Sequence, residues 1–268
     1  MKADLHVHTL FSKDGRTTLE ELVEYAVING IGCVAVTDHN SFEAYEQVKD
    51  NGRVMIIPAE EVSSKEGHIV ALGIDRLIPR GLSIQETIDK IHEAGGYAFA
   101  AHPYRWWSGL GEKNTLGYPF DGIEARNGRS IPSANRKSEA LAKKVGKPIT
   151  AGSDAHTPTH IGEGYVEIPD GLETWKDVVE AIMAGKATAH SQSRHMKGTL
   201  KYGFKSIGEW MLRGFKKMRC EGHPLASHVC LYIRSSSRTS SRGSARSTSS
   251  ALCGSDDSIY FIVEVMLK

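Results

Sequence analysis

The stretch DLHVHTLFSKDG (residues 4–15) lies near the start of the chain and places two histidines within an apolar run. Side chains of an extended strand alternate between its two faces, so His6 and His8 should project from the same face. Two imidazoles presented together are a natural pair of ligands for one metal ion, although the pair alone is weak evidence. Asp14 either forms an Asx turn before Gly15 or bends back towards the same ion.

Beyond this stretch, short β-branched runs alternate with amphipathic segments up to about residue 190, which indicates repeated βα units around a parallel sheet. The expected strands cover residues 3–9, 33–38, 54–63, 68–74, 97–101, 122–126, 148–153 and 165–168. The expected helices cover residues 19–29, 41–50, 83–94, 133–145 and 174–184. Roughly seven such units favour a closed or nearly closed α/β barrel over an open doubly wound sheet, although periodicity leaves closure open.

Signals for helix starts and ends support these boundaries. Thr18 followed by Glu21 is typical of a capping box, and Ser41 is expected to cap the next helix. Glycines should end three of the helices, at positions 30, 95 and 146.

Ionisable side chains gather where the expected strands end, which is where parallel α/β barrels assemble their active sites. They are His6, His8, His39, Glu60, Glu61, His102, Asp154 and His156, together with His68 at the start of a strand. A single histidine is more often a hydrogen-bonded structural residue, but six of the twelve histidines follow this pattern. We therefore expect a cluster of imidazoles and carboxylates that suits borderline to hard divalent ions.

Composition restricts the partners and the compartment. Lysine plus arginine (33) nearly balances aspartate plus glutamate (32), so no global charge favours nucleic acid or a membrane surface. Four unevenly spaced cysteines do not form a disulfide framework, which favours a reducing interior. Without a signal peptide pattern or a run of about 18 apolar residues, the expected location is cytoplasmic, with no membrane partner. The oligomeric state is not readable.

Three regions are expected along the chain: the barrel (1–195), a basic amphipathic helix (196–218) and a low-complexity tail (219–268). The helix either packs on the barrel or binds an anionic partner such as nucleic acid. The tail is rich in serine and arginine between residues 234 and 250, and we expect it to be poorly structured and disordered.

Five motifs carry a resemblance to a known family: DLHVHTLFSKDG, TDHN (37–40), EVS (61–63), AHP (101–103) and GSDAH (152–156). In this order they resemble the PHP (polymerase and histidinol phosphatase) superfamily of metal-dependent phosphoesterases, over residues 1 to about 195. The usual Ser-Asp-Gly is Ser-Lys-Asp-Gly here, a one-residue shift that bears on Asp14.

The resemblance implies a distorted (β/α)7 barrel that holds two or three divalent ions (manganese, zinc or iron) at the C-terminal ends of its strands. The ligands that it implies are His6, His8, Asp14, His39, Glu61, His68, His102, Asp154 and His156. Glu61 is preferred to Glu60 because it precedes Val62 and Ser63, as the family carboxylate does. Glu60 should then lie behind the ligands or face solvent.

Other residues are candidates for holding the phosphate and helping the leaving group. The candidate catalytic residues are Asp14, His160 as proton donor, and Arg105; the candidate substrate-binding residues are Arg105, Arg126 and Asn127. Arg105 should reach over the barrel mouth to the phosphate, unless it is only a surface arginine. Arg126 and Asn127 could bind phosphate or sugar hydroxyls, or be structural. Trp106 and Trp107 either stack on a base or cover the barrel top.

The expected function is hydrolysis of a phosphomonoester by a metal-activated hydroxide. Candidate substrates are a nucleotide such as a nucleoside 3',5'-bisphosphate, a short single-stranded oligonucleotide, or a small phosphorylated metabolite. Histidinol phosphate is an alternative substrate. A protein that binds metal or nucleic acid without turnover is the alternative from a different class.

Overall fold

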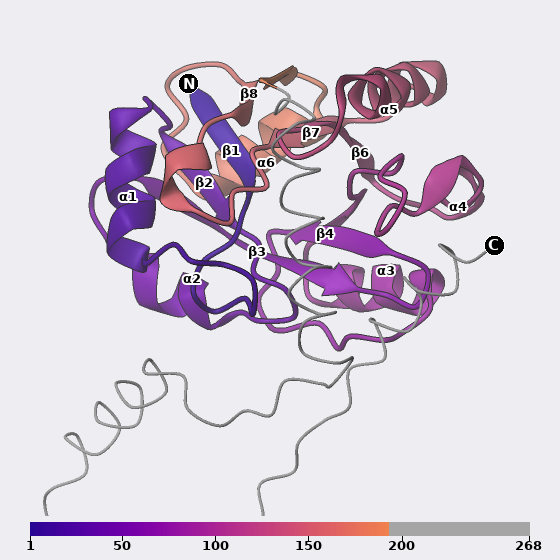
Figure 1. Cartoon of the computed structure of the whole chain (residues 1–268), viewed down its shortest axis with the longest axis horizontal. Helices are drawn as coiled ribbons and strands as arrows, with labels where there is room; N and C mark the ends of the chain where they lie inside the picture. Colours follow the sequence, from indigo (N-terminus) through magenta and orange to yellow (C-terminus); the bar gives the residue numbers. More distant parts are fainter. Residues whose placement is uncertain (193–268) are drawn as a thin grey trace, which may run out of the picture. The chain divides into compact units, whose positions relative to one another are not determined.

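The computed structural model describes residues 1–192, which form a mixed α/β fold around one nine-stranded sheet with the order β7-β6-β5-β4-β3-β2-β1-β8-β9 (Figure 1). The strands are β1 (Lys2–Val7), β2 (Cys33–Val36), β3 (Met55–Ser63), β4 (His68–Leu72), β5 (Tyr97–Ala100), β6 (Gly122–Asn127), β7 (Ile149–Gly152), β8 (Gly164–Glu167) and β9 (Thr188–Ser191). The helices are α1 (Leu19–Ile28), α2 (Glu43–Val48), α3 (Ile84–Glu93), α4 (Gly111–Gly117), α5 (Pro132–Val145), the 3-10 turn η1 (Pro158–His160) and α6 (Trp175–Met183).

The sheet curls until its β7 side approaches β1. The first residues of β1 pair with β8 in antiparallel fashion. Its far end lies against the segment that follows β7: Asp154 N donates to His6 O (2.7 Å), and His8 N donates to Ala155 O (2.9 Å). These bonds make the sheet a nearly closed barrel, which confirms the expected fold class.

The direction of β4 differs from the expected parallel arrangement, because β4 runs antiparallel to both β3 and β5. Only residues 64–67 connect β3 to β4. A parallel crossover needs about a dozen residues or more, so a connection this short can only form a hairpin. As a result His68, the first residue of β4, lies at the same edge as the carboxyl ends of the parallel strands. The strands β8 and β9 are also antiparallel to their neighbours.

The helix boundaries follow the sequence signals with one exception. Thr18 forms the expected capping box with Glu21 at the start of α1, and Gly146 ends α5 in the left-handed conformation. The prediction for Ser41 was wrong: α2 starts at Glu43, and Phe42, which has no capping oxygen, occupies the N-cap. The sequence reading also missed α4 and β9.

Apolar side chains fill the barrel below the ionisable cluster. Leu5, Ile57 and Phe99 belong to one buried group, and Val178 and Ile182 of α6 complete it. Separate apolar groups hold α1 and α2 against β1–β3, and α3 against β3–β5. In β1 and β3 these apolar residues precede the histidines and the glutamate, so the polar end of the barrel rests on a packed core.

No helix within residues 1–192 has the length and apolar character needed to cross a membrane. The predicted basic helix (196–218) and tail (219–268), with the last residues of the predicted barrel region, lie outside the described residues.

Because Gly152 has no side chain, β7 can approach β1 closely enough for the sheet to form a nearly closed barrel. A Cβ added at this position would lie 2.2 Å from His6 Cβ and 2.5 Å from His6 N. Both neighbours belong to the strand that carries the first histidines, so neither can move without displacing them.

We therefore expect Gly152→Ala to lower the free energy of unfolding by about 3 kcal/mol, as overpacking of a rigid interior does. Urea unfolding of the metal-free protein measures this change. Gly117→Ala is the matched control, because no described atom lies within 4 Å of its added Cβ. The control should be neutral or stabilising by up to about 1 kcal/mol. Equal effects of the two substitutions would contradict this account of closure.

Candidate metal centre

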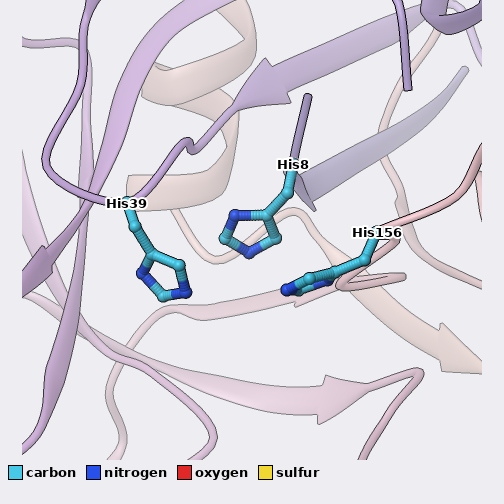
Figure 2. Close-up of side chains that lie close together, drawn as sticks. All are labelled: His8, His39 and His156. Atoms are coloured by element: carbon cyan, nitrogen blue, oxygen red, sulfur yellow. The ribbon is translucent and has the colours of Figure 1, made fainter. Parts of the chain in front are cut away.

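The structure brings together all nine side chains that the sequence nominated as metal ligands. They come from β1 or the loop after it (His6, His8, Asp14), from the loop after β2 (His39), from β3 and β4 (Glu61, His68), and from the loops after β5 and β7 (His102, Asp154, His156). Figure 2 shows the rings of His8, His39 and His156 pointing towards one another from three separate segments. The His8 ring centroid lies 4.7 Å from that of His39 and 4.2 Å from that of His156.

Glu61 lies at the centre of the cluster, where its two carboxylate oxygens face different histidines. The Oε2 atom lies 3.1 Å from His6 Nε2, 3.2 Å from His8 Nε2 and 3.3 Å from His39 Nδ1. The Oε1 atom lies 2.9 Å from both His68 Nδ1 and His102 Nε2. This arrangement is that of a carboxylate able to bridge two ions.

The three nitrogens that face Glu61 Oε2 test whether the cluster fits a metal. His6 Nε2, His8 Nε2 and His39 Nδ1 are buried, and none has a hydrogen-bond partner among the described residues. Each lies close to the carboxylate oxygen without the geometry of a hydrogen bond. Buried imidazole nitrogens without a partner are groups that a bound cation would satisfy.

Four overlapping groups of three residues have ligand atoms that all lie within 4.8 Å of one another. The groups are His8–His39–His156, His6–His102–Asp154, His6–His8–Glu61 and His39–Glu61–His68. Eight of the nine nominated residues occur in them, and Asp14 joins through His156, whose Nε2 lies 2.8 Å from Asp14 Oδ2. The extra Lys13 therefore does not keep Asp14 away. The residues present fit two or more divalent ions.

Polar side chains behind the cluster orient its histidines. His6 Nδ1 lies 2.9 Å from Glu124 Oε1, a contact that fixes the ring and leaves Nε2 facing Glu61. His8 Nδ1 lies 3.2 Å from Ser12 Oγ, which donates to Asp38 Oδ1 at 2.7 Å. The sequence reading assigned no role to these supporting residues. A carboxylate inside the otherwise apolar start of β6 was the signal that could have identified Glu124.

The pKa values of most residues in the cluster are shifted so that the ligand atoms are free of protons and available to a metal ion. Burial, together with the charge of His156, holds the pKa of His8 well below its ordinary value. Burial and the nearby Arg105 lower the pKa of His102 to about 4. Burial alone would raise the pKa of Glu61, but the surrounding histidines hold it well below its ordinary value. Neutral imidazoles and an ionised carboxylate are the forms that bind metal.

His6 behaves differently from His8. Burial lowers the pKa of His6, but the charges of Glu61 and Glu124 outweigh burial and raise it well above its ordinary value. Binding of an ion at His6 would therefore release a proton.

The structure assigns Arg105 a position that differs from the expected one. Its Nη2 donates to Asp154 Oδ2 and to Asn127 Oδ1, both at 2.6 Å, and the residue is 6% exposed. It does not reach over the barrel mouth, because these two acceptors hold it beneath the cluster. Asn127 also donates to Asp154 through Nδ2 (3.1 Å). The pair therefore orients Asp154.

Two further candidates lie away from the cluster. Arg126 donates to Glu139 of α5 at 2.7 Å, because the pairing of β6 with β7 shifts register between Glu124 and Arg126 and turns the arginine outwards. His160 pairs with Glu163 at 2.8 Å on the η1 turn. The structure does not bring either side chain to the cluster.

Glu60 is neither solvent-facing nor in contact with the histidines. It is fully buried, its Oε2 accepts a hydrogen bond from Ile78 N (2.8 Å), and burial raises its pKa to about 8.

Arg129 is a further residue at the cluster to which the sequence assigned no role. Its Nη1 lies 2.9 Å from His156 Nε2, 3.1 Å from Nδ1 and 3.3 Å from Asp154 Oδ1. Burial lowers its pKa, but the charges of Asp154 and Asp14 outweigh burial and raise it. Its side chain is 26% exposed, so a cation borders the cluster on an open side. The available signal was the Gly-Arg-Ser segment (128–130) directly after β6.

Comparison with known proteins gives matches along most of the described chain. A family model described as the PHP domain matches residues 4–97, and one described as PHP-associated matches residues 132–187. An uncharacterised protein of Methanocaldococcus jannaschii is 37% identical over 141 residues, which cover 47% of this chain and 82% of that protein. The 5'-3' exoribonuclease Rnm of Salmonella typhimurium is 35% identical over 118 residues, which cover 35% of this chain and 40% of that protein.

A solved structure shares the fold. It is a two-domain protein from Bacteroides vulgatus that contains a predicted PHP-like metal-dependent phosphoesterase, with a TM-score of 0.61 and 16% identity. The match covers 71% of this chain and 64% of that one. The first family model spans His6 to His68, and the second spans Asp154 and His156, so the two matches include most of the cluster. The chain belongs to the PHP domain family.

Proposed function

We propose that this protein is a metal-dependent phosphoesterase that hydrolyses a phosphomonoester of a nucleotide, such as a nucleoside 3',5'-bisphosphate, or of a short oligonucleotide or small metabolite. The observation that carries the proposal is the position of Glu61, whose two oxygens face two sets of imidazoles. The three buried nitrogens that face Oε2 have no hydrogen-bond partner among the described residues. Bound there, divalent manganese, zinc or iron would activate water for attack on phosphorus and neutralise charge on the phosphate oxygens.

The residues of the chain supply the remaining requirements. Arg129 lies at an open side of the cluster. There its positively charged guanidinium can donate a charge-assisted hydrogen bond to a phosphate oxygen. Arg105 holds Asp154 in position. Asp14 is suited to bind an ion or orient water rather than donate a proton: burial opposes its ionisation, but its bond to His156 holds its pKa well below its ordinary value. The proton donor is unassigned, because His160 pairs with Glu163.

Two observations bear on the alternatives: the name of a relative bears on the substrate, and the cluster bears on whether the protein turns a substrate over. The name of the Salmonella relative, an exoribonuclease, supports a nucleotide or oligonucleotide substrate over histidinol phosphate. A protein that binds without turnover would tolerate loss of individual ligands, whereas all nine nominated side chains lie at the cluster.

The test is a metal analysis combined with a substrate screen. The protein is loaded with manganese, zinc or iron, and phosphate release is measured from nucleoside bisphosphates, 5'-phosphorylated oligonucleotides and histidinol phosphate. The proposal expects turnover of a nucleotide substrate. Preference for histidinol phosphate would select the first alternative. Metal binding without turnover, with RNA binding that weakens steeply with salt, would select the second.

We expect Arg129→Ala to lower kcat/KM by about 100-fold, as loss of one preorganised donor does. Phosphate release by the metal-loaded protein measures the effect. Arg126→Ala is the matched control from the same segment, because Arg126 pairs with Glu139 on α5. The control should change kcat/KM by less than about twofold. Similar losses in the two variants would remove Arg129 from the site.

A further inference from the structure

The loop that follows His102 is fixed by its own backbone. Arg105 N donates to His102 O (2.8 Å), Gly109 N donates to Arg105 O (2.8 Å), and Gly111 N donates to Pro103 O (2.9 Å). A Cβ added at Gly109 would lie 2.5–2.7 Å from three carbonyl oxygens of this loop, so the loop is tightly wound. The backbone positions from which Trp106 and Trp107 project are therefore fixed.

This loop holds two tryptophans in solvent. Trp106 is 66% exposed and Trp107 is 43% exposed. Their ring centroids lie 5.3 Å apart, and the rings are nearly perpendicular at 84°. Tryptophan gains more from burial than almost any other side chain, so a rigid loop that exposes two adjacent indoles forgoes that gain. At this exposure much of each indole is free to contact a ligand, which favours base stacking.

One guanidinium connects the pair to the candidate metal centre. The Cζ atom of Arg105 lies 5.4 Å from the Trp107 ring centroid, and the same side chain donates to Asp154 at 2.6 Å. The Trp107 indole is therefore separated from Asp154, a candidate metal ligand, by one side chain.

We propose that Trp106 and Trp107 form a stacking subsite for the terminal base of a nucleotide or single-stranded oligonucleotide whose phosphate lies at the metal centre; this rests on the proposed function. Trp106 is the more exposed ring and offers a face to the base. The Trp107 ring, which contacts Arg105, lies nearly perpendicular to the Trp106 ring and would flank the edge of the stacked base. Every base has a π face, so the subsite selects for the presence of a base and tolerates its identity.

The kinetic test compares two substrates that differ only in the base. One is a 5'-phosphorylated trinucleotide. The other is the same trinucleotide with an abasic tetrahydrofuran residue in place of the terminal 5' nucleoside. In the metal-loaded protein, Trp106→Ala should raise KM about tenfold for the first substrate and leave the second unchanged. Trp106→Phe should recover most of the loss, because it retains an aromatic face. Leu116→Ala, another exposed apolar residue (45%) on the adjacent α4, should have no effect.

A second measurement does not depend on turnover. In metal-free protein carrying Trp175→Phe and Trp210→Phe, all tryptophan fluorescence comes from the loop. The phosphorylated trinucleotide should quench this fluorescence, and its abasic counterpart should not. Equal quenching by both, or an equal KM change for both in Trp106→Ala, overturns the subsite while the phosphoesterase proposal stands. If quenching requires the base but the metal-loaded protein hydrolyses no phosphate ester, the subsite is supported and the proposed activity is refuted.

Discussion

Glu61→Gln is expected to lower both the metal content and the turnover of the protein, with kcat/KM falling at least about 1000-fold. The substitution removes one negative charge and replaces an oxygen by an amide nitrogen that cannot bind a cation. Either carboxylate oxygen faces at least two imidazoles, so the loss affects both candidate ion positions. Elemental analysis after chelation and reloading measures bound metal, and phosphate release measures turnover.

The neighbouring carboxylate supplies the matched control for this experiment. Glu60 is one residue away on β3, but it is buried apart from the cluster and bonds to Ile78 N. Burial raises its pKa to about 8, so at neutral pH it is mostly protonated and resembles an amide. Glu60→Gln should therefore retain metal and activity within about twofold. Unchanged metal content in Glu61→Gln, or an equal loss in Glu60→Gln, would refute the proposed role of Glu61 as a metal ligand.

The metal cluster could be predicted from sequence because its information is local. His6 and His8 share a strand face by alternation, and Glu61, His102 and Asp154 each lie where an apolar run ends. The sequence does not give the partner of each side chain across the barrel. For this reason it nominated the histidines, whereas Glu124 was visible only as a carboxylate in an apolar run, without its contact to His6.

The arginines show where local patterns fail. Arg126 lies on β6, the strand that carries Glu124, yet a register shift in the pairing of β6 with β7 turns it to α5. Arg129 reaches the cluster from the turn beyond. Such a shift has no signature in hydrophobic periodicity, so the choice between the two arginines required the structure.

The antiparallel direction of β4 could have been predicted from the sequence. The short connection before His68 was visible and forces β4 to be antiparallel. The number of βα units favoured near closure of the sheet, but periodicity left it open, because closure depends on the approach of Gly152 to His6 from a distant part of the chain.

Glu60 also predicts how the stability of the metal-free protein depends on pH. Its pKa is about 8 in the folded protein, against an ordinary value of 4.5 that applies to the unfolded chain. Below pH 4.5 both states hold the proton, and no stability is lost. Between pH 4.5 and pH 8 the unfolded chain releases the proton while the folded protein keeps it. The free energy of unfolding should therefore fall by at most about 1.4 kcal/mol per pH unit over this range.

Glu60→Gln isolates this contribution, because an amide at this position does not ionise. Urea unfolding of both proteins in a chelating buffer at pH 5, 6, 7 and 8 gives the difference between their unfolding free energies. The histidines and carboxylates of the cluster titrate alike in the two proteins, so their effects cancel in the difference. The difference should move in favour of Glu60→Gln as the pH rises, by several kcal/mol in total. A constant difference would mean that Glu60 is already ionised in the fold, and Glu60→Gln could then no longer serve as the neutral control for Glu61→Gln.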